Sequence, residues 1–121
     1  MFKKVLIVDD EKDFCELVKN FLETLCYQVI VAYNGDTAAD LLEKIRFDFV
    51  LFDCNTPGLS GVELIDVLRS KAPDALRIMV SGYEGISERF AKHMGVDEYL
   101  EKPVTLAKLK EMLKKGDRNE R

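Results

Sequence analysis

Acidic, hydroxyl and lysine side chains stand directly after apolar runs at four places in the chain, in a combination that suits cation and phosphate binding. The four groups are Asp9-Asp10-Glu11, Asp53-Cys54-Asn55, Ser81-Gly82 and Glu101-Lys102-Pro103. If the apolar runs are neighbouring strands of one sheet, the groups that follow them meet at one edge and form a single pocket. The chemistry of that pocket depends on its three aspartates, its serine and its lysine.

Three aspartates in one pocket repel one another, so the pocket needs a proton or a bound cation. Oxygen ligands favour Mg²⁺, Mn²⁺ or Ca²⁺ over zinc or copper, and Mg²⁺ also accepts phosphate oxygens. A cation beside Lys102 would neutralise a phosphoryl group, which is a main requirement of phosphoryl transfer. An aspartate carboxylate is a suitable nucleophile for that step. The pattern therefore indicates a pocket that phosphorylates one of its own carboxylates.

Five strands must position these groups, and apolar runs predict them at residues 5–8, 29–32, 49–52, 78–80 and 98–100. The first four are continuous and rich in branched residues, which is typical of parallel strands buried on both faces. Segment 14–25 has one apolar stripe at helical spacing, and Asp13 with Glu16 predicts a capping box at its start. Further helices are predicted after Asn34-Gly35-Asp36, at about 62–71 and 85–94, and after Thr105, a candidate cap.

A strand–helix unit repeated five times predicts parallel strands joined by right-handed crossovers, with helices on both faces. At this length it favours an α/β flavodoxin-like (βα)5 three-layer sandwich with strand order 2-1-3-4-5. Ligands in such a sheet bind beyond the carboxyl ends of the strands where the order reverses, here between the first and third strands. We expect one domain at residues 1–115, with a polar tail or the start of a linker at 116–121.

Composition excludes several classes of function. The 121 residues are 47% apolar and 33% charged, which is ordinary for a globular protein. The net charge is −4 and the sequence has no stripe of basic residues, so we do not expect direct nucleic-acid binding. No run approaches the roughly 20 apolar residues of a membrane span, and no signal peptide is recognisable, so we expect a cytoplasmic chain without membrane binding. Three separated cysteines and a single histidine do not suit a zinc site, and mostly buried thiols are expected.

Each polar group also has a plain structural explanation. Asp9 and Asp10 could cap the following helix, residues 53–58 could be only a turn, and Lys102 could be a solvated surface charge. Ser81 could simply end a strand. The meeting of four strand ends at one location favours the functional interpretation. Outside the pocket, Cys54 should point into the core on the opposite face from Asp53, by strand alternation.

The chain resembles the receiver domain of two-component response regulators over essentially its whole length. The motifs that carry the resemblance are Val8-Asp9-Asp10-Glu11, Asp53, Pro57-Gly58 with Gly61, Ser81-Gly82-Tyr83 and Lys102-Pro103. The resemblance implies that Asp53 accepts a phosphoryl group from a sensor histidine kinase or a histidine phosphotransfer protein, in a Mg²⁺-dependent reaction. The chain would then catalyse only its own phosphorylation and dephosphorylation and would not otherwise be an enzyme.

The resemblance also implies a metal site for Mg²⁺, with Mn²⁺ as an alternative. Asp10 would be a direct ligand and Asp9 would act through water. Asp53 and the backbone carbonyl of Asn55 would complete the protein ligands.

Further roles implied by the resemblance concern signalling. Lys102 would pair with Asp53 and then with a phosphate oxygen, and its bond to Pro103 is a candidate cis peptide. Ser81 and Tyr99 would be the switch residues that respond to phosphorylation. The output would be binding to a downstream protein, control of a fused effector domain, or formation of a homodimer.

Two positions have features of their own. Thr56 stands where the family often has methionine, and we expect it to affect partner fit without a part in the chemistry. Tyr83 is bulky and should flank, with Asn55, the path of an attacking water, so we expect it to slow dephosphorylation. His93 has no ligand partners and is expected at the surface.

Two other classes of function share parts of the pattern. A haloacid-dehalogenase-like phosphatase uses a similar Asp-x-Asp motif, but Asn55 here replaces the second carboxylate and the acidic pair precedes the nucleophile. A flavin-binding or dinucleotide-binding module would need a Ser/Thr- or Gly-rich loop after the first strand, where Asp9-Asp10-Glu11 would repel phosphate. A receiver that no longer accepts phosphate is disfavoured because all five polar motif positions hold suitable residue types.

Overall fold

Short, mostly apolar runs form four strands of a five-stranded parallel sheet, and Glu98-Tyr99-Leu100-Glu101 forms the fifth. The computed structural model describes residues 2–82 and 87–118. The strands are β1 Lys4–Val8, β2 Gln28–Ala32, β3 Phe49–Phe52, β4 Leu76–Ser81 and β5 Glu98–Glu101. The helices are α1 Lys12–Thr24, α2 Gly35–Lys44, α3 Gly61–Lys71, α4 Glu88–Met94 and α5 Leu106–Arg118. All neighbouring strands are parallel, in the order β2-β1-β3-β4-β5, which confirms the predicted flavodoxin-like sandwich.

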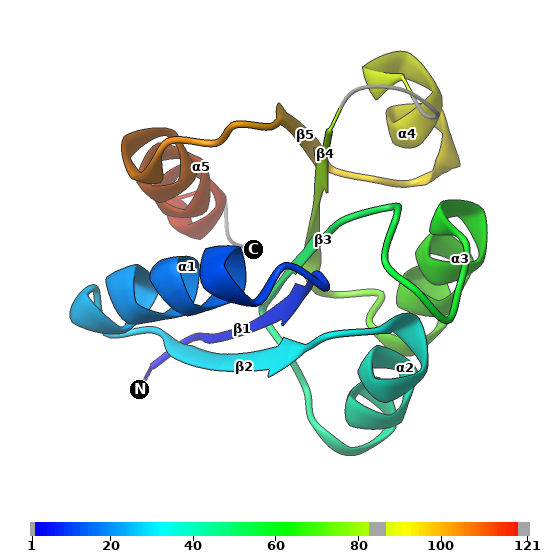
Figure 1. Ribbon diagram of the computed structural model, residues 1–121, viewed down its shortest axis with the longest axis horizontal. Coiled ribbons are helices and arrows are strands. Elements are labelled where there is room, and N and C mark those ends of the chain that lie inside the picture. Colours follow the sequence, from blue (N-terminus) through cyan, green and yellow to red (C-terminus); the bar gives the residue numbers. More distant parts are fainter. Residues whose placement is uncertain (1, 83–86, 119–121) are drawn as a thin grey trace.

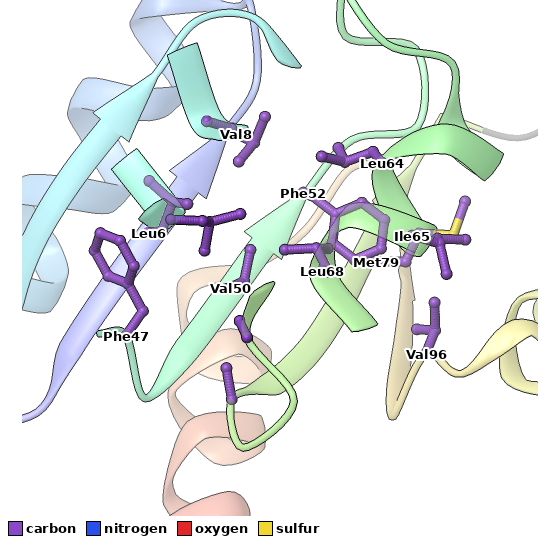
Figure 2. Packing of buried hydrophobic residues seen from close by; sticks show 14 of the residues in the cluster. Leu6, Val8, Phe47, Val50, Phe52, Leu64, Ile65, Leu68, Met79 and Val96 are labelled. Atoms are coloured by element: carbon purple, nitrogen blue, oxygen red, sulfur yellow. The ribbon is translucent and has the colours of Figure 1, made fainter. Parts of the chain in front are cut away.

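Helices cover both faces of the sheet, and the side chains of β1 alternate between the two resulting cores. Helices α1 and α5 lie on one face, whereas α2, α3 and α4 lie on the other (Figure 1). Leu6 and Val8 belong to the cluster under α2, α3 and α4, and Val5 and Ile7 to the cluster under α1 and α5. Figure 2 shows the first cluster, with the ring of Phe52 lying against α3. Burial on both faces explains why β1 is apolar from Val5 to Val8.

Two predicted helix caps are confirmed. The side chain of Asn34 accepts a hydrogen bond from the backbone N–H of Thr37 at the start of α2, at 2.8 Å. The hydroxyl of Thr105 accepts one from the backbone N–H of Lys108 at the start of α5, at 3.1 Å. Each cap satisfies a donor that the first helical turn leaves without an intrahelical partner.

The capping box predicted at Asp13 and Glu16 is wrong. Helix α1 starts before Asp13, and its N-cap residue is Glu11, whose side chain makes no capping hydrogen bond. Asp13 therefore lies inside the first turn, where its charge still interacts favourably with the helix dipole. The structure instead has a capping box at the start of α3, where Ser60 and Glu63 exchange side-chain to backbone hydrogen bonds.

The last helix extends past the domain end expected at residue 115. A Cβ atom built on Gly116 would lie 2.8 Å from Cδ2 of Leu76, so this turn of α5 packs closely on the sheet. The expected division into a domain at 1–115 and a tail at 116–121 stays a prediction. Among the helices in 2–82 and 87–118, none has both the length and the apolar character needed to cross a bilayer.

Candidate phosphoryl-acceptor site

The residues predicted to form the site, among them Asp9, Asp53 and Lys102, follow the carboxyl ends of strands at one edge of the sheet. Hydrogen bonding between neighbouring strands continues past the last residue of each strand. The backbone N–H of Asp53, just after β3, donates to the carbonyl of Val8 at 2.9 Å. Lys102 N–H likewise donates to the carbonyl of Ser81 at 2.8 Å. These bonds fix the backbone at which the side chains leave the sheet, so strand pairing places Asp9, Asp53 and Lys102 together.

Lys102 is the centre of the site. Its ammonium Nζ lies 2.9 Å from Oδ2 of Asp53, 3.0 Å from Oδ2 of Asp9 and 2.6 Å from Oε1 of Glu11. The ring of Phe14 lies beside it, with 5.0 Å between Nζ and the ring centroid. One cation therefore pairs with three carboxylates, which leaves excess negative charge at the site, and it is shielded on one side by an aromatic ring.

The carboxylate of Asp53 is held at both oxygens. Oδ1 accepts the backbone N–H of Asn55 at 3.0 Å, and Oδ2 accepts the ammonium of Lys102. The residue is only 7% exposed, so water reaches little of it. The orientation of this carboxylate is therefore fixed by one backbone amide and one ammonium.

The site concentrates negative charge in a poorly hydrated place. Asp9 is 2% exposed, and this burial raises the pKa of its carboxyl group. The N–H of Glu11 and the ammonium of Lys102 act in the opposite direction without cancelling the effect of burial. Burial alone would lower the pKa of Lys102, but its hydrogen bonds to the three carboxylates outweigh burial and raise that pKa. Lys102 is therefore firmly protonated at neutral pH.

The donor set fits a hard divalent cation. Asp9, Glu11 and Asp53 each offer a carboxylate oxygen, and the three atoms lie within 4.8 Å of one another. An all-oxygen set with excess negative charge suits Mg²⁺, Mn²⁺ or Ca²⁺. Asp10, expected as the direct ligand, is exposed and lies outside this group, whereas Glu11 lies in it.

The expected switch residues belong to the adjoining part of the sheet. Ser81 is fully buried, and its hydroxyl lies 3.9 Å from Sγ of Cys54, within hydrogen-bonding range for sulfur. Cys54 is part of the core cluster under α2, α3 and α4, as strand alternation predicted. Tyr99 is half-buried and packs against the same cluster.

The structure also tests predictions about one peptide bond, the single histidine and the cysteines. The bond between Lys102 and Pro103 is cis, as the resemblance suggested. His93 is exposed, as expected. Cys15 and Cys54 are buried, which confirms the expectation of mostly buried thiols, whereas Cys26 is exposed in the turn after α1, where its φ is 70°. Tyr83 lies outside the described residues, so its expected effect on dephosphorylation stays a prediction.

Three residues at the site make contacts that the sequence interpretation did not predict. Glu11 was noted only as part of an acidic run, and Phe14 only as part of an apolar stripe. Thr56 was expected in the loop beside Asp53, with an effect on partner fit, but its side chain is buried, with 4% exposed, and offers a partner almost no surface. Glu11 and Phe14 stand near Asp9 in the sequence, but their approach to Lys102 depends on the turn into α1.

Comparison with known proteins gives one consistent family. The family model described as response regulator receiver domain matches residues 5–114. A CheY-like receiver domain protein from Methanospirillum hungatei is 32% identical, with a TM-score of 0.90 over 98% of this chain and 96% of that chain. TrrA from Thermotoga maritima, solved in complex with Mg²⁺-BeF, is 33% identical, with a TM-score of 0.84 over 95% and 99%. CheY4 of Vibrio cholerae is 27% identical, with a TM-score of 0.87 over 96% and 99%.

Proposed function

Since the chain belongs to the response regulator receiver domain family, we propose that Asp53 accepts a phosphoryl group and that this modification switches partner binding. The observation that carries the proposal is the ammonium of Lys102, within 3.0 Å of carboxylate oxygens on both Asp53 and Asp9. This arrangement holds a buried nucleophile beside a permanent positive charge. A phosphoryl group that arrives at Asp53 would find the counter-charge already in place.

The reaction would proceed by attack of an Asp53 carboxylate oxygen on the phosphorus atom of a phosphohistidine. The new P–O bond forms as the P–N bond breaks, and the electron pair returns to the imidazole nitrogen. The N–H of Asn55 keeps the carboxylate oriented during this exchange. Lys102 passes from the carboxylate to a phosphoryl oxygen, so the positive charge follows the negative charge.

The acidic group would hold the divalent cation. We propose Mg²⁺, or Mn²⁺ in its place, with Asp9, Asp10, Asp53 and the carbonyl of Asn55 as ligands, and with Glu11 close enough to contribute. When bound, the cation supplies charge neutralisation to the phosphoryl oxygens. The solved complex of TrrA with Mg²⁺-BeF supports this part of the proposal.

The signal would pass through Ser81 and Tyr99. Ser81 ends β4 beside the acceptor strand, and Tyr99 lies in the neighbouring β5. We propose that the hydroxyl of Ser81 binds the phosphoryl group and that Tyr99 responds by changing its packing. The two states must differ in their affinity for the phosphoryl group, since otherwise phosphorylation shifts no equilibrium.

The partners would be a histidine kinase or phosphotransfer protein as donor, and a downstream protein, a fused effector domain or a second copy as receiver of the signal. The chain would act in the cytoplasm and catalyse only its own phosphorylation and dephosphorylation. Direct binding to nucleic acid or membrane is not part of the proposed function.

Intact-mass spectrometry after incubation with acetyl phosphate and Mg²⁺ tests the acceptor. The expected result is the gain of one phosphoryl group by the wild type and none by Asp53→Asn. Asp66→Asn, which changes an exposed carboxylate on α3, is the matched control and should gain the group normally. An unmodified wild type, or a modified Asp53→Asn variant, would overturn the proposal. Rapid turnover of a phosphate monoester would point to a phosphatase instead.

A further inference from the structure

Thr56 joins the ends of the two strands that carry Asp9 and Asp53. It lies in the loop between β3 and α3 and is 4% exposed. Its hydroxyl Oγ1 lies 2.8 Å from the carbonyl oxygen of Asp53 and 3.4 Å from that of Val8. A hydroxyl has one proton to donate, so the shorter contact with Asp53 is the main hydrogen bond. This buried hydroxyl thus bridges the ends of β1 and β3, next to Asp9 and Asp53.

The turn that Thr56 closes also orients the acceptor carboxylate. Its backbone closure is weak, because the N–H of Thr56 reaches the carbonyl of Asp53 at 3.3 Å. Inside the turn, the N–H of Asn55 donates to Oδ1 of Asp53 at 3.0 Å, which leaves Oδ2 facing Lys102. The Thr56 hydroxyl therefore stabilises the backbone that holds the Asn55 amide against the carboxylate.

We propose that Thr56 is a positioning residue for phosphoryl acceptance, an inference that rests on the proposed function of Asp53. Its hydroxyl keeps the turn of residues 53–56 closed and so keeps the carboxylate of Asp53 in its reactive orientation. The hydroxyl does not touch the phosphoryl donor. Its loss should therefore lower the rate of the transfer step and leave the concentration of donor needed for half-saturation unchanged.

Three variants separate this role from a general effect on stability. Thr56→Val removes the hydroxyl and keeps the shape, whereas Thr56→Ser keeps the hydroxyl and removes a methyl group. Thr24→Val is the matched control, because the hydroxyl of Thr24 also donates to the carbonyl three residues earlier, that of Phe21, but at the far end of α1. Thr24→Val changes the same groups without reaching the site.

The measurement is the rate of Asp53 phosphorylation at increasing acetyl phosphate concentration and saturating Mg²⁺. We expect Thr56→Val to lower the maximal rate about three- to tenfold, which is the range that corresponds to one net hydrogen bond. Thr56→Ser and Thr24→Val should stay within about twofold of the wild type. Independently of activity, NMR hydrogen exchange of the Asn55 amide should be faster in Thr56→Val and unchanged in Thr56→Ser.

The experiments on Thr56 can fail without contradicting the proposed role of Asp53 as phosphoryl acceptor. If the wild type gains no phosphoryl group, the proposed function fails. If the wild type reacts and Thr56→Val reacts equally fast with unchanged exchange at Asn55, the positioning role is refuted and the acceptor role stands. Equal losses in Thr56→Ser and Thr56→Val would also refute it, because the methyl group and not the hydroxyl would then matter. Should Thr56→Val not fold, comparison of Thr56→Ser with Thr56→Ala isolates the hydroxyl in the same way.

Discussion

Replacement of Lys102 by methionine should destabilise the metal-free protein, because this ammonium is paired with all three carboxylates of the group. At about 3 Å and an effective dielectric constant of about 20, each contact has a gross Coulomb energy of roughly 5 kcal/mol. The contact with Glu11 contributes little, since that side chain is 62% exposed. The contacts with Asp9 and Asp53 involve side chains that are 2% and 9% exposed, and removal of one partner from such pairs costs about 3–5 kcal/mol.

The expected net loss is smaller than this range, because the side chain of Lys102 is itself 18% exposed and the burial cost of its ammonium disappears with it. We therefore expect Lys102→Met to lower the free energy of unfolding by about 2–4 kcal/mol at pH 7. For a domain of this size the change corresponds to a fall in melting temperature on the order of 10 °C. Urea unfolding in the presence of a chelator, followed by circular dichroism, measures it directly.

A matched surface pair controls for the loss of a positive charge. Lys92 pairs with Glu88 on α4, where both side chains are about half exposed, and Lys92→Met should change stability by less than about 1 kcal/mol. Addition of Mg²⁺ should then recover more stability in Lys102→Met than in the wild type, because a bound cation replaces the missing charge. A Lys102→Met variant as stable as the wild type without metal would refute the electrostatic reasoning.

The raised pKa of Lys102 determines how the stabilisation by this residue depends on pH. The carboxylates raise the pKa of Lys102 above its ordinary value of 10.5 despite burial. The stabilisation is therefore complete below pH 10.5 and is lost as pH rises through the higher pKa of the folded state. The difference in stability between wild type and Lys102→Met should persist at neutral pH, and on the alkaline side it should shrink only in strong alkali.

Three further predictions follow from the described contacts. Ser81→Ala should retain phosphorylation but bind a downstream partner equally with and without the phosphoryl group; equal partner affinity of the phosphorylated variant and phosphorylated wild type would contradict this. Iodoacetamide should modify the exposed Cys26 of the native protein and spare Cys15, since burial raises the pKa of the Cys15 thiol to about 12; peptide mass spectrometry measures both. Tyr27→Phe should lower the free energy of unfolding by about 1 kcal/mol, because the phenol donates to Oδ2 of Asp117 at 2.9 Å, and unchanged urea unfolding would contradict it.

The sheet could be predicted because burial on both faces leaves a direct mark on the sequence. Strand β3 occupies the predicted residues 49–52, which are apolar throughout and flanked by aspartates. Strand β4 was predicted two residues too short at its start, because Arg77 interrupts the apolar pattern. The guanidinium of Arg77 donates a hydrogen bond to the carbonyl of Gly95 at 2.9 Å, so this charged side chain is accommodated within the strand. Such a partner comes from tertiary structure and has no local signal.

From the sequence, only those site residues could be predicted whose position follows from the order of the strands in the sheet. Asp9, Asp53 and Lys102 follow strands whose order the repeated strand–helix pattern implies, so their meeting could be expected. The direction of a side chain one or two residues further on depends on loop backbone, which apolar periodicity does not report. This explains why Glu11 rather than Asp10 lies in the carboxylate group, and why Thr56 turns inward to the carbonyl of Asp53.

The buried negative charge of Asp9 makes the metal-free fold less stable at neutral pH. Burial raises the pKa of Asp9, so the folded state holds a proton more readily than the unfolded chain. Stability associated with Asp9 is therefore present below its ordinary pKa of 3.8 and is lost as pH rises through the higher pKa of the folded state. At neutral pH the fold thus carries a buried charge that Lys102 offsets only in part, since burial still dominates the pKa of Asp9. A bound cation, or a phosphoryl group on Asp53 that draws Lys102 away, would change this balance, so the proposed phosphorylation would act on the stability of the surrounding strands.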